Sequence, residues 1–175
     1  MRNTKKITLS ASVVALSAVF MVLGALVDVL DLSACALASL LVAFVFVEIG
    51  APYTYLVWLA TSLITFICFP GSAIWLEYLL VFGIYPIIKA YIERLPRWSW
   101  LILKLVYGAL SVGAVVALFA KITGVPFFEG VDALWLKVGV LLFLVVAFIL
   151  YDIFLTVLLR FYFERLRNRI KHLLK

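Results

Sequence analysis

Long apolar runs separated by short polar breaks extend through almost the whole chain. A run of about 17–25 apolar residues has the length of a helix that crosses a bilayer, whereas the strands of a membrane barrel alternate polar and apolar positions over about ten residues. The runs here are continuous, so the pattern predicts six transmembrane helices. These spans cover residues 7–27, 32–48, 52–69, 73–92, 98–120 and 133–159.

The composition leads to the same fold class. Hydrophobic residues make up 67% of the 175 residues and charged residues only 14%. A soluble globule of this size cannot enclose so much apolar surface, and in hydrocarbon every backbone polar group must be paired within the protein, as it is in a helix. We therefore expect an all-α polytopic membrane protein, a compact bundle of six helices that forms a single integral membrane domain over residues 1–175.

Prolines mark breaks between and within the runs. Pro52 suits the first turn of a helix, where its missing N–H would be unpaired anyway, and Pro70-Gly71 is a turn signal. Pro86 lies inside the fourth run, where it removes the hydrogen bond to the carbonyl of Phe82 and predicts a kink.

The charged residues predict the topology. Lys and Arg gather at the N-terminus, at residues 94–97 and in the tail 160–175, and six spans place all three groups on the cytoplasmic side. This arrangement explains the net charge of +6 without nucleic acid. We expect both termini in the cytoplasm and the tail as an amphipathic basic helix, which anchors on anionic lipid or docks a partner. The turns on the opposite side carry Asp28, Asp31, Glu129 and Asp132.

Motifs for catalysis are missing from the sequence. It has no Walker loop, no HExxH and no GxSxG motif, and its single histidine, His172, lies in the tail. Both cysteines, Cys35 and Cys68, fall in apolar runs and fit small buried hydrophobic residues. We therefore expect no enzyme activity, no cofactor and no metal site.

Three ionisable residues lie within the spans on the cytoplasmic side. Asp152 is about five turns into the sixth span, Lys104 about two turns into the fifth, and Lys89 near the end of the fourth. Because an isolated charge is costly in lipid, we expect Asp152 to form a buried ion pair with Lys104 or Lys89. A proton relay would need a longer chain of such groups.

Glu77 is an ionisable residue within a span near the outer face. It lies about one turn into the fourth span beside Trp75 and Tyr78, and Trp135 begins the sixth span at the same level. An acid among aromatic rings can hold a cationic or aromatic solute through charge and stacking. The alternative is a residue of the interfacial belt whose carboxylate reaches water.

Small residues recur at helical spacing in three spans and allow another helix to approach closely. Such a stripe serves either packing within the bundle or contact with a partner. The first span carries Ala11, Ala15, Ala18 and Ala25, the second carries Cys35, Ser39 and Ala43, and the fifth carries Ala109, Gly113 and Ala117.

This chain combines a basic head at Arg2–Lys6 with the pattern Ala11-x-x-x-Ala15. It also combines its overall length with six expected spans whose two ends lie inside. In these features the chain resembles the substrate-binding S components of energy-coupling factor transporters. In that family six helices capture a vitamin or similar small solute near the outer face. An AxxxA surface docks onto a membrane coupling subunit that two cytoplasmic ATPases drive.

The resemblance implies a location and partners. Ala11 and Ala15, with Ala18 on the same helix, would face the coupling subunit, and the protein would be a multi-pass component of a bacterial inner or plasma membrane. Its function would be solute binding in a vitamin or micronutrient importer.

The resemblance also implies a solute site. The solute would lie among Glu77, Tyr78, the turn of Asp31 and the loop residues Phe128 and Glu129. Because the turn between the first two spans is short, the loop of residues 124–132 would close this site.

Two other functions remain open. A non-transporting membrane scaffold, or an accessory subunit of another complex, explains the small-residue stripes and the basic tail without a solute cavity. A small intramembrane enzyme lacks a catalytic constellation in this sequence.

Overall fold

The computed structural model describes residues 3–124 and 134–166, and these ranges are helical without any strand. It confirms the all-α bundle, with six helices long and apolar enough to cross a membrane, so the chain is a multi-pass membrane protein. The long spans are α1 (Asn3–Leu26), α2 (Asp31–Glu48), α3 (Ala51–Cys68), α6 (Arg97–Thr123) and α7 (Leu134–Phe161). The fourth span consists of α4 (Ile74–Glu77), the π-helical η2 (Tyr78–Phe82) and α5 (Tyr85–Ile92). The short segment η1 (Asp28–Leu30) precedes α2, and η3 (Tyr162–Leu166) follows α7.

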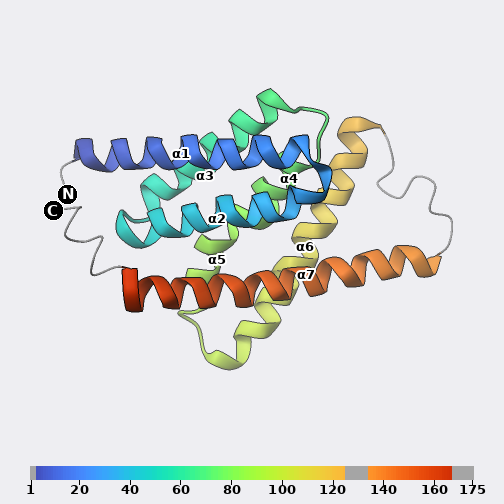
Figure 1. The fold of residues 1–175 in the computed structure, drawn as a ribbon. Coiled ribbons are helices and arrows are strands. Elements are labelled where there is room, and N and C mark those ends of the chain that lie inside the picture. The colour runs from blue at the N-terminus through green and yellow to red at the C-terminus, as the bar shows by residue number, and fades with distance from the viewer. Residues whose placement is uncertain (1–2, 125–133, 167–175) are drawn as a thin grey trace.

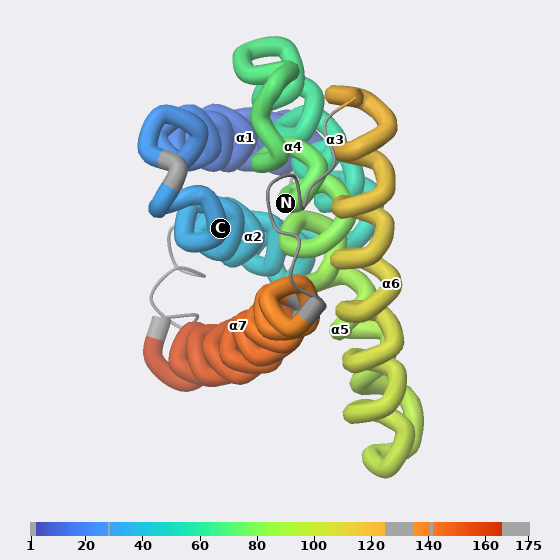
Figure 2. The backbone as a smooth tube through the Cα atoms, turned by 90° about the vertical axis from the view of Figure 1, so that its right-hand side faces the viewer, coloured from blue at the N-terminus to red at the C-terminus, as the bar shows by residue number. Residues whose placement is uncertain are grey.

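The spans alternate in direction, and the fourth span lies at their centre. Figure 1 shows α1, α2 and α7 running side by side, with the fourth span behind α2. In Figure 2 α6 forms the opposite flank, and the fourth span lies between α2 and α6, both of which it contacts. Burial agrees with this arrangement. In the 18-residue apolar stretch of each span, 56% of the fourth span is buried, compared with 17% for α6 and 18% for α7. Helices α6 and α7 are therefore the spans most exposed to lipid.

Two close contacts between helices depend on glycine. A Cβ added at Gly24 of α1 would lie 2.5 Å from the Cβ of Ala34 in α2. A Cβ at Gly108 of α6 would lie 2.8 Å from the ring of Phe148 in α7. Small residues let transmembrane helices approach each other in this way, because dispersion contacts hold them together in lipid.

The predicted irregularity at Pro86 begins earlier in the span than the proline itself. The amide of Gly83 donates to the carbonyl of Tyr78 at 2.7 Å. Donor and acceptor are five residues apart, which is the spacing of a π-helix. The helix then breaks and restarts at Tyr85, with Pro86 in its first turn. The proline thus lies where its missing N–H costs least.

Side chains from three other helices pair the carbonyl groups of this irregular segment. The indole N–H of Trp58 in α3 donates to the carbonyl of Leu79 at 3.0 Å. The hydroxyl of Tyr107 in α6 donates to the carbonyl of Leu80 at 2.5 Å. The hydroxyl of Tyr151 in α7 lies 3.4 Å from the carbonyl of Phe82, the group that Pro86 frees. A broken helix is tolerated in a membrane when its neighbours supply such partners.

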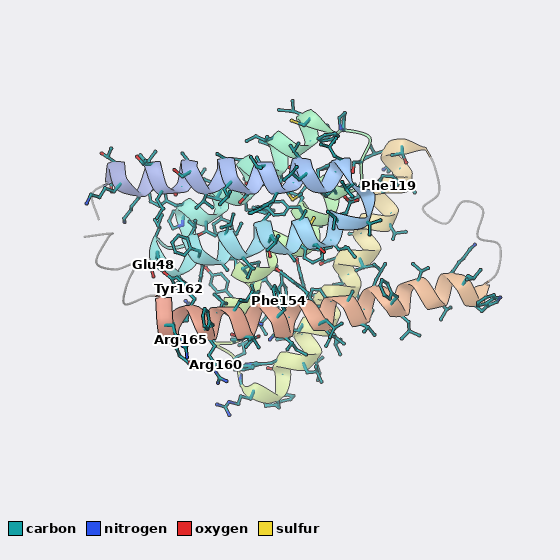
Figure 3. The ribbon with its side chains drawn as sticks, in the orientation of Figure 1. Glu48, Phe119, Phe154, Arg160, Tyr162 and Arg165 are labelled. Atoms are coloured by element: carbon teal, nitrogen blue, oxygen red, sulfur yellow. The ribbon has the colours of Figure 1, made fainter. Side chains whose placement is uncertain are left out.

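The structure brings most of the described basic groups to one end of the bundle, whereas Lys121 at the end of α6 and Lys137 near the start of α7 lie at the other end. Because the spans alternate, the start of α1, the α5–α6 turn and the end of α7 meet at the more basic end. Figure 3 shows Arg160 and Arg165 at this end, where Glu48 of α2 and Tyr162 lie together. The Tyr162 hydroxyl donates to Glu48 Oε1 at 2.9 Å. This pair fastens the end of α7 to the end of α2.

Candidate solute cavity and buried charge cluster

A small cavity lies between α2, η2, α6 and α7, in the half of the bundle that holds the α1–α2 turn. Its volume is about 50 Å³. Glu77 is the only charged side chain among the described residues that line it, and all the others are apolar. Val81 and Phe82 come from η2, Val115 from α6, and Phe148 from α7.

The carboxylate of Glu77 is poorly compensated. Its Oε2 atom is buried and has no hydrogen-bond partner among the residues that the structure describes. Asp31, at the start of α2, is an electrostatic neighbour of the same sign. A buried polar atom without a partner costs about 1–3 kcal/mol, and more when it is charged. This end of the cavity therefore favours a hydrogen-bond donor or a cation.

The aromatic residues predicted to surround Glu77 lie elsewhere. The Trp75 ring packs edge-on against Phe66 of α3, with their centroids 4.8 Å apart, and Tyr78 is completely buried in the core. Neither lines the cavity. Trp135 is 73% exposed and borders only a shallow hollow on α7 itself. None of the three rings therefore lies at this cavity, and contact of these rings with a solute stays a prediction. Trp75 and Tyr78 are near Glu77 in sequence, but neighbouring positions of a helix point in different directions.

The loop part of the predicted site is not described. Phe128 and Glu129, and the loop that was expected to close the site, lie outside residues 3–124 and 134–166. The described lining instead adds Phe148 and the α6 valines to the predicted site. These apolar residues were missed because nothing distinguishes them in the sequence from residues that face lipid.

A cluster of charges lies in the other half of the bundle. The structure brings together all three residues of the expected ion pair, because Asp152 accepts from both Lys89 and Lys104. The Lys89 ammonium contacts Asp152 Oδ1, and the Lys104 ammonium lies 3.0 Å from Oδ2. Glu93, which the sequence interpretation did not include, lies 3.1 Å from Lys104 and 3.6 Å from Lys89. The four formal charges therefore sum to zero.

Neutral groups complete the cluster. The Lys89 ammonium also donates to the hydroxyl of Thr156 at 2.5 Å and to the carbonyl of Asp152 at 2.9 Å. The Tyr85 hydroxyl donates to Asp152 Oδ1 at 2.6 Å. Lys89 is only 2% exposed, yet its ammonium is surrounded by acceptors. Buried charges are stable only when paired and hydrogen-bonded in this way, so the cluster ties α5, α6 and α7 together.

Aromatic rings separate the cavity from the cluster. Phe148 lines the cavity on one side, and its ring packs edge-on against Tyr85 with the centroids 4.8 Å apart. Tyr85 in turn stacks on Tyr107 at 5.6 Å. The ring layer joins the same three spans as the cluster and seals the inner side of the cavity.

The three alanines of the expected docking stripe on α1 do not share one exposed face. Ala11 and Ala15 are exposed, whereas Ala18 is buried against the bundle. Ala18 therefore packs internally, and its assignment to the docking surface is wrong. On α6 the second stripe of small residues is exposed throughout. It comprises Ala109, Gly113 and Ala117.

Within the described residues, no group of three or more His, Cys, Asp or Glu side chains could hold a metal ion. The cavity instead offers one carboxylate in an apolar enclosure, which suits non-covalent binding. Comparison of the chain with protein-family models finds no match. The curated proteins and the solved structures give no match either.

Proposed function

We propose that this protein is the membrane-embedded solute-binding subunit of an importer in a bacterial plasma membrane, of the energy-coupling factor type. In this role it captures a small solute, such as a vitamin or another micronutrient, near the outer face and relies on partner ATPases for energy. The observation that carries the proposal is the cavity with the uncompensated carboxylate of Glu77. A purely structural bundle gains nothing from a buried acid without a partner.

The location of the cavity supports capture from outside. It lies toward the end opposite the larger number of basic groups, which is the outer end by the positive-inside rule. Its present volume of about 50 Å³ accommodates a few water molecules rather than a whole vitamin. Helices α6 and α7 form one wall and are the least buried spans. The charge cluster joins them in the inner half of the bundle, so a movement at the outer end can leave the cluster in place. A larger solute would enter by moving this wall.

The exposed part of the α1 stripe supports docking to a coupling subunit. Ala11 and Ala15 leave the helix backbone accessible to a partner helix in the inner half of the bundle. The test is native mass spectrometry of the full chain, purified in mild detergent from its own membrane. Co-purification of a membrane subunit and ATPases, lost on Ala15→Trp, would support the proposal. Normal assembly of the Ala15→Trp protein would contradict the docking surface.

The exposed α6 stripe favours a second function, that of an accessory subunit in another membrane complex. Nothing lies within 4 Å of a Cβ added at Gly113, so this face is free for a partner helix. Ala117→Trp is therefore the matched variant for Ala15→Trp. The importer proposal expects assembly to survive Ala117→Trp, whereas an accessory subunit that binds through α6 would lose its complex with this change alone.

A further inference from the structure

We propose that the cavity beside Glu77 selects a hydrophobic organic monocation, an apolar body that carries a single ammonium group. The inference rests on the proposed solute-binding function and names the chemical class of the solute. It rests on an apolar enclosure and, among the described residues, on a carboxylate without a counter-charge and on a cavity wall without basic side chains.

The cavity wall selects an apolar body. Every described lining residue except Glu77 is aliphatic or Phe, with contributions from four helical elements. Val115 and Phe148 are both buried, so these wall positions belong to the apolar core of the bundle. Such a wall provides no partners for hydroxyl or carboxylate groups, and a polyhydroxylated or zwitterionic solute would lose its hydrogen bonds to water on entry.

The carboxylate selects one positive charge. Glu77 Oε2 is buried, lines the same cavity and has no hydrogen-bond partner in the described part of the chain. An ammonium group would supply the missing donor and the counter-charge together, as a charge-assisted hydrogen bond. Asp31 adds a second negative neighbour and strengthens the local field for a cation.

Basic side chains of residues 3–124 and 134–166 do not fill this role. Lys89 and Lys104, the basic side chains deepest in the described spans, are engaged with Asp152 and Glu93 in the other half of the bundle. Neither lines the cavity. The charge cluster is neutral overall, so it also gives Glu77 no net positive field.

Other ligand classes fit less well. A hard divalent cation takes six or more oxygen ligands or retains its water, and the apolar wall offers neither. An organic anion would meet two acids of its own sign. A neutral apolar molecule would leave Glu77 Oε2 without a donor, which is the cost that binding should remove.

The test measures binding of three probes with the same carbon chain, n-hexylammonium, n-hexanol and hexanoate. The full-length protein is studied in detergent micelles by isothermal titration calorimetry at neutral pH, with protein-free micelles as the blank. We expect n-hexylammonium to bind the unmodified protein at least about tenfold more tightly than n-hexanol, since hydrogen bonds to charged groups contribute about 1.5–3 kcal/mol. Hexanoate should show no binding.

Two substitutions at one position locate this preference. Glu77→Gln keeps the shape and removes the charge, and it should weaken n-hexylammonium binding at least about tenfold. Glu77→Leu should reverse the order, so that n-hexanol binds more tightly than n-hexylammonium. Glu48→Gln is the matched control, because Glu48 pairs with Tyr162 at the far end of the bundle, and its binding should equal that of the unmodified protein.

The outcomes distinguish the two proposals. Equal affinity for n-hexylammonium and n-hexanol, unaffected by Glu77→Gln, would overturn the cation class but leave solute binding in place. A cavity-filling change, Ala147→Trp on the α7 wall, should abolish binding of every probe. If all probes still bind the Ala147→Trp protein, or if none binds the unmodified protein, the cavity itself is not the solute site and both proposals fail.

Discussion

Asp152 shows how a single carboxylate can organise three transmembrane helices. It lies on α7 and receives Lys89 from α5, Lys104 from α6 and the hydroxyl of Tyr85. Each lysine alone would be costly in lipid, and the carboxylate compensates both. The charges balance only because Glu93, 33% exposed at the inner edge, adds the second negative charge.

The first prediction concerns this residue. Asp152→Asn leaves Lys89 buried without its main counter-charge and should lower the free energy of unfolding by about 3 kcal/mol, measured by thermal unfolding in detergent. Lys89→Met combined with Asp152→Asn restores the charge balance and should cost less than Asp152→Asn alone. Glu164→Gln is the control, because this acid is 67% exposed in a surface pair and should matter little. Equal loss for Asp152→Asn and the control would show that the cluster is not stabilising.

At the scale of the element, packing of α6 against α7 depends on one position. Gly108 meets the Phe148 ring, which is itself held between Tyr85 and Tyr107. Gly113, one and a half turns further along α6 by helical geometry, has nothing within 4 Å of an added Cβ. Two glycines on one helix thus have opposite roles.

Comparison of Gly108→Ala with Gly113→Ala tests this contrast. The first should destabilise the protein by about 1–3 kcal/mol, because the ring has no room to move in a packed core. The second should be neutral or stabilising, since Ala is a better helix former than Gly by about 1 kcal/mol. Thermal unfolding of both variants in the same detergent provides the measurement, and a Gly108→Ala protein as stable as Gly113→Ala would refute the close contact.

At the scale of the whole molecule, six alternating spans place the ends of α1 and α7 together and the Glu77 cavity toward the opposite end. The proposed capture of a solute from outside requires the latter end to face the exterior. Cys68 can test this orientation in the membrane, because it is exposed at the end of α3, on the cavity side.

A membrane-impermeant maleimide should therefore label Cys68 in intact cells. Cys35 is fully buried and should not react in the folded protein, so Cys68→Ser should abolish labelling. Labelling that occurs only in inverted membrane vesicles would place the cavity on the cytoplasmic side and exclude capture from outside.

The sequence by itself determined the number of spans, their alternating direction and the depth of each ionisable residue. These properties are local, because the length of an apolar run and the position of a charge within it can be counted along the chain. They were sufficient to select Lys89, Lys104 and Asp152 as partners, since only charges at similar depth can meet in a bundle.

The tertiary structure alone decided which faces meet. It buried Ala18 while Ala11 and Ala15 stayed exposed. It placed Trp75 and Tyr78 outside the cavity lining. It also added Glu93 to the charge cluster and Phe148 to the cavity wall. The physical reason is that helices in lipid are apolar on every side. Periodicity therefore does not distinguish a core face from a lipid face, and only the positions of the helices relative to one another decide it.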